Sequence, residues 1–477
     1  MRNWRMPWMV IAPLLAGNVH AQYWAPLGTP IEFRPQVNVV FGDTVWDRLL
    51  VGGNFKYLYP DQDSLEVTSI AAWDGQEWAG LADTIQVCNG NLCAPVWEFF
   101  RYKGELYANG SFGFYTADSL DNIGFARWNT VLQAWTELEC PNDQMNGIAT
   151  LVPLPPQETM YFTGYLGTLC GYDSSCVFTY DGDTITPFDL DDPLLQCDGN
   201  YVGYVFEYLG TTYVTGLLWD PDLQQGHSFM RWTGSELEDV PGWSTLDPIK
   251  DILIHDGQLY VCGWFFEATG GPGNMVARFD GQQWHTLGSG LTMTLAPSTG
   301  GVALDLHEWN DDIYVAGQFN YAGGASAINA ARWNGNQWCG LGGLPYLQTD
   351  TGTAWSLTTW RDELYMAGAF VTIDGDTMWN VARWLGQVEN CSEPVAVVED
   401  RKKVQFTLLP SGDGQWTLVA PVATQGTLEI HDVQGRLLSF ESAENGHVID
   451  LHDRSPGIYI VRIVPTAGAA WSARVKR

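Results

Sequence analysis

Basic residues are scarce in this 477-residue sequence, which contains 23 Lys and Arg against 55 Asp and Glu and carries a formal net charge of -32. The shortage is uneven, because residues 22–389 hold 12 basic residues against 45 acidic ones, whereas residues 390–477 hold 9 against 10. A surface with this excess of carboxylates repels phosphate backbones and anionic lipids and attracts cations or basic partners. We therefore expect no nucleic acid among the partners of this protein.

Long hydrophobic runs are missing beyond residue 21, and no later stretch reaches the length of a membrane-spanning helix. The first 21 residues combine Arg2 and Arg5 with an apolar run from Trp8 to Gly17 and the small-residue ending Val19-His20-Ala21. This order is typical of a signal peptide. The sequence therefore predicts a protein without a transmembrane segment that is exported through the periplasm and is secreted or attached to the outer cell surface.

Recognisable catalytic motifs are absent as well. The sequence contains no Gly-x-Ser-x-Gly nucleophile elbow, no phosphate-binding loop and no His-Glu-x-x-His zinc motif. The predicted propeller described below contains only isolated histidines, which lack the short spacing of metal-binding pairs; they are His227, His255, His285 and His307. We expect structural roles for them, and we assign no catalytic residue from the sequence.

Cysteines, by contrast, are present in a number that predicts disulfides in an exported chain, since there are nine. Their close spacing favours the pairs Cys88–Cys93 and Cys170–Cys176. The remaining candidates can pair among themselves in several ways, which the sequence leaves open; they are Cys140, Cys197, Cys339 and Cys391. Cys262 is left over within the strand-like run LYVCGWF, so we expect a buried, unreactive thiol there.

A four-part pattern recurs along residues 22–390. Its clearest copy consists of VALDLHEWN, DDIYVAGQF, NAARWNG and NQWCGLG, short β-branched and aromatic segments separated by turn residues, which are typical of antiparallel strands. The second segment recurs seven times at intervals of 47 to 57 residues, each time with a glycine: Gly53, Gly110, Gly164, Gly216, Gly263, Gly317 and Gly368. Seven predicted four-stranded sheets indicate an all-β, seven-bladed β-propeller. A six-bladed ring is the alternative if the weaker third or fourth copy is not a blade.

The seventh copy, ARWLGQVENC, lacks the Trp-x-x-Leu-Gly segment with which other copies end. The same segment stands at the start of the predicted mature chain, as Trp24-Ala25-Pro26-Leu27-Gly28. Pairing this N-terminal strand into the last blade closes the ring without an open sheet edge. We therefore predict ring closure through Trp24, Leu27 and Gly28.

Two residue types recur at fixed repeat positions, which favours framework roles over ligand contacts. One set of arginines directly precedes the third-segment aromatic residue: Arg127, Arg231, Arg278, Arg332 and Arg383. We expect these arginines to pack their stems and to pair with acids between blades. The corresponding tryptophans are predicted core residues: Trp73, Trp128, Trp232, Trp333 and Trp384.

Two resemblances follow from these motifs. Copies such as VARFDGQQWHTLGSGL and AARWNGNQWCGLGGL resemble secreted bacterial propeller repeats of the Kelch-like, galactose-oxidase-central-domain kind over about residues 23–389. The tail segments GTLEIHDVQGRLLSF, HVIDLHDRSPGIYIVRI and SARVKR resemble the C-terminal sorting domain of type IX secretion cargo over about residues 395–477. That family's Tyr-Pro-Asn-Pro opening is replaced here by Leu409-Pro410-Ser411-Gly412.

The second resemblance implies a small β-sandwich that directs passage across the outer membrane and makes the type IX machinery a partner. We therefore predict three parts: a signal peptide at 1–21, a propeller at 22–390 and a sorting sandwich at 391–477, with its core at about 404–477.

The long connections of the repeat should gather on one face of the propeller, where binding loops usually lie. Dense carboxylates occupy two of them, Asp61, Asp63 and Glu66 in the first and Asp189, Asp191 and Asp192 in the second. The first group offers oxygen ligands of the kind that Ca²⁺ needs, although neither group has EF-hand spacing and solvated acidic loops explain both. Ca²⁺ is the one cofactor for which the sequence offers a site.

The leading hypothesis is an exported recognition or adhesion module that binds a carbohydrate or protein ligand through this acidic long-loop face. One alternative is a carbohydrate-active hydrolase or lyase with carboxylates at the propeller channel. A structural surface component is the other. The missing catalytic motifs favour binding, although propeller enzymes often have dispersed sites.

Overall fold

The computed structural model of the protein describes residues 23–27, 35–55, 57–58, 65–67, 69–81, 88–89, 92–93, 95–115, 120–122, 124–136, 148–150, 159–164, 175–188, 190, 192–195, 200–220, 222–294, 300–342, 345–346, 352–373, 376–386, 390–391, 407–412, 415–419, 425–431, 437–444, 447–452, 454–455, 458–465 and 471–476. These residues form an all-β structure, in which the helical elements are two short 3-10 turns, η1 (Pro193–Leu195) and η2 (Glu267–Thr269). None of the described helical turns is long and apolar enough to cross a membrane.

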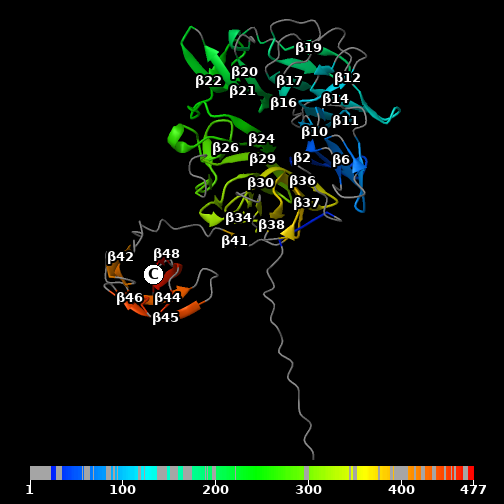
Figure 1. The fold of residues 1–477 in the computed structure, drawn as a ribbon. Helices are drawn as coiled ribbons and strands as arrows, with labels where there is room; N and C mark the ends of the chain where they lie inside the picture. Colours follow the sequence, from blue (N-terminus) through cyan, green and yellow to red (C-terminus); the bar gives the residue numbers. More distant parts are fainter. Residues whose placement is uncertain are drawn as a thin grey trace, which may run out of the picture. The chain divides into compact units, whose positions relative to one another are not determined.

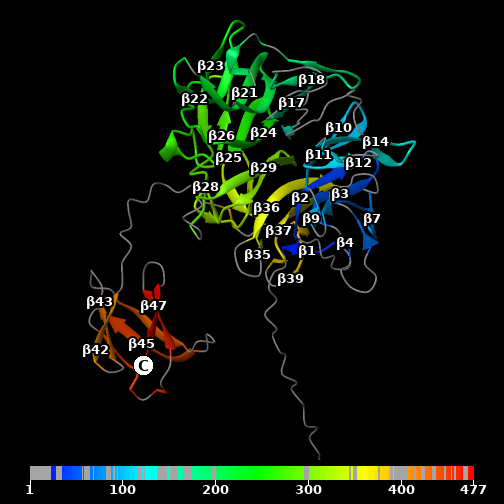
Figure 2. The ribbon, with the colours of Figure 1, turned by 45° about the horizontal axis from the view of Figure 1, so that its top comes forward.

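The chain divides into two compact units, Met1–Pro394 and Val395–Arg477. Within the described part of the first unit there are seven antiparallel sheets of four or five strands, which we number 1 to 7 in chain order (Figures 1 and 2). In every sheet the strands lie side by side in the same order. The first strand of each copy lies at one edge of its sheet.

Sheets 1 to 4 have the following strands. Sheet 1 contains β2 (Pro35–Asp43), β3 (Arg48–Phe55), β6 (Ile70–Trp73) and β7 (Trp78–Gly80); sheet 2 contains β10 (Val96–Tyr102), β11 (Glu105–Gly110), β14 (Phe125–Asn129) and β15 (Ala134–Thr136); sheet 3 contains β16 (Ile148–Thr150), β17 (Met160–Gly164), β18 (Phe178–Tyr180) and β19 (Ile185–Pro187); sheet 4 contains β20 (Tyr201–Tyr208), β21 (Thr211–Asp220), β22 (Gln225–Trp232) and β23 (Leu237–Asp239).

Sheets 5 to 7 complete the set. Sheet 5 contains β24 (Ile249–His255), β25 (Gln258–Gly263), β26 (Val276–Phe279) and β27 (Trp284–Thr286); sheet 6 contains β29 (Val302–Trp309), β30 (Asp312–Gln318), β33 (Ala330–Trp333), β34 (Trp338–Gly340) and β41 (Asn390–Cys391); sheet 7 contains β36 (Thr353–Trp360), β37 (Glu363–Ala369), β40 (Val381–Trp384) and β1 (Trp24–Ala25). In Figure 1 the first strands β2, β10, β24, β29 and β36 lie toward the middle of the unit, so we call them inner strands.

Short hairpins and small sheets occupy the connections between these strands. They are β4 (Tyr57–Leu58) with β5 (Leu65–Glu66), β8 (Cys88–Asn89) with β9 (Leu92–Cys93), β12 (Gly113–Tyr115) with β13 (Leu120–Asn122), β28 (Leu291–Thr292) with β31 (Tyr321–Ala322) and β32 (Ala325–Ser326), and β35 (Pro345–Tyr346) with β38 (Thr372–Ile373) and β39 (Asp376–Thr377).

The repeat glycine of each copy is explained by a bulge in the first strand. All seven first strands shift register just after the residue that opposes this glycine, as at Ala303/Asp305 in β29. A Cβ atom on Gly317 would lie 2.2 Å from the carbonyl oxygen of Val302, and one on Gly368 would lie 2.1 Å from that of Thr353. Because no side chain fits at such distances, glycine is required where the two backbones approach.

The fourth-segment tryptophan joins neighbouring sheets. The indole N–H of Trp135 donates to the Leu81 carbonyl oxygen at 2.6 Å, and that of Trp338 donates to Leu287 at 2.7 Å. In both cases the acceptor directly follows the fourth strand of the preceding sheet. The Trp-x-x-Leu-Gly segment therefore supplies a donor for one sheet junction and an acceptor for the next.

The N-terminal strand takes the fourth position of sheet 7. β1 pairs antiparallel with β40, which places Trp24 opposite Trp384. The Trp24 side chain is 2% exposed, and its indole N–H donates to the Gly342 carbonyl oxygen at 3.0 Å, so it repeats the contact made by Trp135 and Trp338. Leu27 is also buried, whereas Gly28 lies outside the described residues.

Sheets 7 and 1 are in direct contact, although they are far apart in the sequence. The Val40 N–H donates to Ser356 Oγ at 3.3 Å, and the Gly42 N–H donates to Thr358 Oγ1 at 3.0 Å. These bonds connect the first strand of the first sheet with the first strand of the last one.

The repeated arginines and tryptophans are framework residues, but the arginine partners differ from our expectation. Arg127 pairs with Glu105 at 3.3 Å, Arg332 with Asp312 at 3.0 Å and Arg383 with Glu363 at 2.9 Å. Each acid begins the second strand of the same sheet instead of belonging to a neighbouring one, because the second and third strands pair directly. Arg231 likewise pairs with Glu238 of its own sheet, and Arg278 lies opposite Tyr260 in the second strand of its own sheet.

The repeated tryptophans lie in the core as predicted. Trp73, Trp128, Trp333 and Trp384 are buried, and the partly buried Trp232 packs against the cluster shared by sheets 3 and 4.

The described cysteines include one disulfide, Cys339–Cys391, which ties β41 to sheet 6 within the first unit. Cys262 is a free, buried thiol, as expected. The β8–β9 pairing places Cys88 opposite Cys93, and Cys176 is disulfide-bonded. Cys140, Cys170 and Cys197 lie outside the described residues.

The second unit contains two antiparallel sheets that share one core. The first is β42 (Thr407–Gly412), β43 (Gln415–Val419) and β46 (Val448–Asp450); the second is β44 (Gln425–His431), β45 (Leu437–Glu444), β47 (Ile458–Pro465) and β48 (Trp471–Lys476). Leu418 and Ile449 from the first sheet pack with Leu428, Val461 and Val475 from the second. Shared burial of this kind is what holds a β-sandwich together.

Replacing Trp24 with Ala should destabilise the first unit by about 3–5 kcal/mol, because it leaves a cavity in the core and removes the donor to Gly342. The free energy of unfolding in guanidinium chloride measures this effect. Trp219→Ala is the matched control, since the Trp219 side chain is 48% exposed. Equal stability of the two variants would contradict a structural role for the N-terminal strand.

Candidate functional site

The bulges of the inner strands bring polar and aromatic side chains to one end of the sheets. Trp97, Lys250 and Trp355 are the residues skipped by the register shifts of β10, β24 and β36, and Tyr204 is one of the two residues skipped in β20. Glu98, Asp251 and Asp305 directly follow such shifts. Bulges commonly re-aim side chains next to functional sites. We call these seven residues the mouth.

Two carboxyl groups of the mouth are enclosed and bonded to the neighbouring sheet. The Leu306 N–H donates to Asp251 Oδ2 at 2.7 Å, and the Leu357 N–H donates to Asp305 Oδ2 at 2.5 Å. The two carboxyl groups also affect each other's pKa, so they lie close together. Asp251 and Asp305 are partly accessible to solvent, although protein atoms surround most of each carboxyl group. The pair therefore connects sheets 5, 6 and 7 from the inside.

Desolvation governs the protonation of this pair. It raises the pKa of Asp305 to about 7 and the pKa of Asp251 well above its ordinary range, and the charge of Asp305 raises the latter further. At neutral pH at least one proton is therefore held between the two groups, as expected for carboxyl groups in contact.

Residues from sheets 2 and 4 face the same interior. The charges of Asp251 and Glu98 add to the burial that raises the pKa of Tyr204, and Glu98 also raises the pKa of Asp251. The Tyr204 hydroxyl donates to the Lys250 carbonyl oxygen at 2.5 Å. Four sheets thus contribute ionisable side chains that shift one another's pKa.

Aromatic side chains of the mouth present both ring surface and N–H donors. Trp97 is 43% exposed, and its indole N–H donates to Ser111 Oγ at 3.2 Å, which orients the ring. The enclosed Trp355 Nε1 has no hydrogen-bond partner among the described residues. Trp264, which follows β25 at the same end of the sheets, is 47% exposed. Exposed aromatic rings beside carboxylates are suited to ligand binding.

The acids that the sequence singled out do not belong to the mouth. Asp61, Asp63, Asp189 and Asp191 lie outside the described residues, and Glu66 is described only by its backbone in β5, opposite Tyr57. Among the described residues, no three His, Cys, Asp or Glu side chains are grouped so as to hold a metal ion.

Asp192 has structural contacts. Its carboxylate is 9% exposed and accepts the Leu194 N–H and the Leu237 N–H, both at 2.9 Å. It therefore links η1 to the fourth strand of sheet 4 instead of offering an exposed oxygen ligand.

The histidines of the first unit have structural partners, in agreement with the sequence. His227 pairs with Asp239 and His285 with Asp280, each at 2.8 Å. His255 of sheet 5 contacts Glu308 of sheet 6 at 3.2 Å. His307 contacts Thr359 Oγ1 of sheet 7 at 3.2 Å, and burial lowers the pKa of His307 to about 4, so it stays neutral at physiological pH.

Sequence reasoning missed the mouth because it looked for carboxylates in loops. A usable signal was present, since Glu98, Asp251 and Asp305 each stand 12 residues before the repeat glycine of their copy. An acid at one repeat position in three copies indicates that three sheets present it at the same place. The bulge that turns this position inward is visible only in the structure.

Comparisons with known proteins give limited results. No family model and no curated protein matches the chain. Among solved structures, it is similar to the extracellular domain of a hybrid two-component system from B. thetaiotaomicron, at 12% identity and a TM-score of 0.40 over 92% of this chain and 55% of that one. It is also similar to the extracellular domain of a one-component system from the same organism, at 10% identity and a TM-score of 0.43 over 95% and 59%. The chain thus spans somewhat more than half the length of these structures, and the functional proposals below use its own residues.

Asp305→Asn should stabilise the protein more at pH 8 than at pH 5. Because the pKa of Asp305 is raised to about 7, folding takes up a proton between about pH 4 and pH 7, so its contribution to stability falls as pH rises through that window. Asparagine cannot ionise and still accepts the Leu357 N–H. The gain at pH 8 relative to pH 5 should reach at least about 1.4 kcal/mol, the equivalent of one pKa unit.

Chemical denaturation at the two pH values measures this difference, with Asp222→Asn in an exposed turn as the control. An Asp305→Asn effect that is the same at both pH values would show that the carboxyl group is not held neutral in the folded protein.

Proposed function

We propose that this chain is an exported recognition module in which residues 22–390 form a closed seven-bladed β-propeller. Seven sheets with one strand order support this architecture, as do hydrogen bonds across every successive junction, including the bond of Ser356 in sheet 7 to Val40 in sheet 1. The junctions between sheets 2 and 3, 3 and 4, and 4 and 5 are bonded by Tyr102 to the Tyr180 carbonyl, Thr163 to that of Gly203 and Tyr208 to that of Gly257.

The mouth is the proposed ligand site, and a carbohydrate is the proposed ligand. The observation that carries this proposal is the clustering of Glu98, Tyr204 and the Asp251–Asp305 pair, together with the exposed ring of Trp97, the residue next to Glu98 in the chain. Sugars combine apolar C–H faces, which pack on aromatic rings, with hydroxyl groups, which bond to carboxylates and amides. An acidic surface also disfavours anionic polymers, so neutral glycans fit best.

The contacts of the acid pair favour binding over the hydrolase alternative. Asp305 has the raised pKa of a general acid, at about 7. However, each carboxyl group accepts a backbone N–H of the neighbouring sheet and the two affect each other's pKa at close range, whereas retaining glycosidases separate their carboxyl groups by about 5–5.5 Å and inverting ones by more. We therefore place the pair in the framework of the site and not in a glycosidase mechanism.

Export is proposed from the two ends of the chain. Residues 1–21 have the order of a signal peptide, and the segment 391–477 resembles type IX sorting domains. The two-sheet core of the second unit is compatible with such a sandwich. The type IX machinery is accordingly the proposed export partner, and the outer surface or the medium is the proposed destination.

Binding to a panel of neutral polysaccharides, with and without Ca²⁺, tests the proposal. We expect retention of the purified chain without new reducing ends or unsaturated products, and at least about a tenfold loss of affinity in Trp97→Ala, since rings at the centre of a site often contribute more than 1.4 kcal/mol. Trp219→Ala, with a similarly exposed ring outside the mouth, should bind as the unaltered chain does.

The other outcomes separate the alternatives. New chain ends would make the protein an enzyme, and binding to none of the glycans would favour a protein ligand or a structural surface role. Retention that requires Ca²⁺ would support a metal site at Asp61, Asp63 and Glu66, which stays a prediction.

A further inference from the structure

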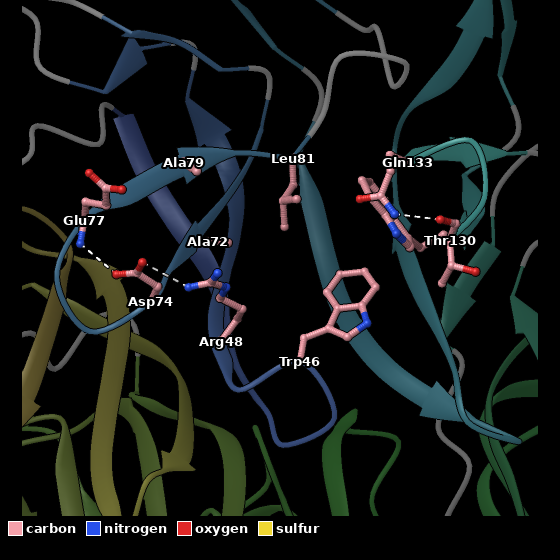
Figure 3. Close-up of a pocket in the computed structure, with 10 residues that line it drawn as sticks. Trp46, Arg48, Ala72, Asp74, Glu77, Ala79, Leu81, Thr130 and Gln133 are labelled. Carbon is pink, nitrogen blue, oxygen red and sulfur yellow. Dashed lines mark hydrogen bonds and ion pairs between the residues drawn. The ribbon is translucent and has the colours of Figure 1, made fainter.

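A concave site lies between sheets 1 and 2, at the strand ends opposite to the mouth (Figure 3). Its volume is about 600 Å³, within the range of small-molecule sites. We call it the Trp46 groove. The side chains used below are Trp46, Arg48, Asp74, Glu77, Trp128 and Gln133, which come from the β2–β3 turn and from the ends of β6, β7, β14 and β15.

The turn that presents Trp46 is longer than the corresponding turns of five other copies. Four residues join β2 to β3, whereas two join the corresponding strands of sheets 2, 4, 5, 6 and 7. A two-residue turn already closes this hairpin in those five copies, so the fold does not require the longer one. Insertions in individual copies of a repeat often belong to a binding surface.

Contacts from both neighbouring sheets hold Trp46 in place. The Arg101 guanidinium lies 4.9 Å from the centre of the Trp46 ring and also donates to both oxygens of the buried Asp43, at 3.0 and 2.5 Å. Trp128 packs against the same indole edge-to-face at 5.4 Å. On the other side of the turn, Asp47 accepts two bonds from Arg361 of sheet 7, at 2.8 and 2.7 Å. Trp46 is therefore positioned before any ligand arrives, and it keeps part of its ring exposed.

Oriented polar groups flank this ring on both sides. Arg48 pairs with Asp74 at 3.1 Å, and Asp74 also accepts the Glu77 N–H at 2.9 Å. Across the groove, the Gln133 side-chain amide donates to the Thr130 carbonyl oxygen at 2.6 Å. Figure 3 shows Trp46 and Leu81 between the polar side chains of sheet 1 and those of sheet 2.

The neighbouring junction lacks this arrangement. A smaller groove of about 420 Å³ lies between sheets 7 and 1, where Arg361 lies 4.2 Å over the Trp360 ring. The Trp360 side chain is only 3% exposed, so that groove presents no aromatic surface of the same kind. The accessible indole therefore distinguishes the junction of sheets 1 and 2 from that of sheets 7 and 1.

We propose that the Trp46 groove binds a neutral hexopyranose unit, independently of the mouth. The indole offers a surface for the C–H face of the sugar, and Arg48, Glu77 and Gln133 offer donors and acceptors for its hydroxyl groups. Asp74 compensates the charge of Arg48, and Glu77 leaves the lining acidic, which disfavours uronic acids and sulfated sugars.

Calorimetric titration of the purified chain with neutral disaccharides of glucose, galactose and mannose, and with a uronic-acid disaccharide as the charged counterpart, tests this site. At least one neutral sugar should bind, Trp46→Ala should weaken it at least about tenfold, and Trp46→Phe should recover part of the loss. Gln133→Ala, which alters a polar side chain without opening the core, should weaken it by about threefold to tenfold.

Two further variants separate this proposal from that for the mouth. Trp97→Ala should leave the Trp46-dependent binding unchanged, and Trp219→Ala should affect neither site. The proposal is overturned if no neutral sugar binds, if Trp46→Ala and Gln133→Ala both bind normally, or if the uronic acid binds as well as the neutral sugars. Loss of binding in Trp97→Ala alone would assign all binding to the mouth.

Discussion

The hydrogen bonds that run from one inner strand to the next carry the architecture of the first unit. Asp251 accepts a backbone N–H from sheet 6, Asp305 accepts one from sheet 7, and Ser356 accepts one from sheet 1. These three residues occupy the same place in their sheets, directly after the bulge. A single sheet of four short strands has little core of its own, so its stability depends on such junctions with its neighbours.

The same constraint creates the candidate site. A bulge leaves residues of the first strand out of the pairing, and these include Trp97 in β10, Tyr204 in β20, Lys250 in β24 and Trp355 in β36. In β24 and β29 the residue after the bulge is an aspartate that bonds to the next sheet, which brings carboxyl groups into a poorly solvated interior. Burial then raises the pKa of Asp251 and Asp305. The carboxyl groups that join the sheets therefore hold a proton near neutral pH.

The two ends of the sheets differ in how the repeat shapes them. At the mouth, sheets 2, 4, 5, 6 and 7 contribute residues that lie at or directly after the bulge, so the chemistry of this candidate site depends on which residues these copies have there. At the opposite end most of the hairpin turns are short, and the Trp46 groove arises where the first copy has a longer turn. Arg101 and Arg361 hold this longer turn through Asp43 and Asp47, which converts an insertion into a rigid surface.

The sequence by itself determined the elements and much of their order. Alternating apolar segments, turn residues and the periodic glycine predicted the strands, and the incomplete seventh copy predicted the pairing of Trp24 beside Trp384, because these signals depend on local spacing and on the need to cover a sheet edge. The framework roles of the repeated Arg, Trp and His residues followed from the same periodicity. The partners of the arginines did not, since strand pairing selects the nearest acid.

Only the tertiary structure decided where the candidate sites lie. Asp192 looks like an exposed loop carboxylate in the sequence, yet backbone N–H groups from two elements enclose it. Asp251 and Asp305 lie within strand-like segments that resemble core, and the bulge in each strand turns them toward one another. Such positions depend on register and on contacts between residues about 50 apart in the chain, which local patterns do not encode.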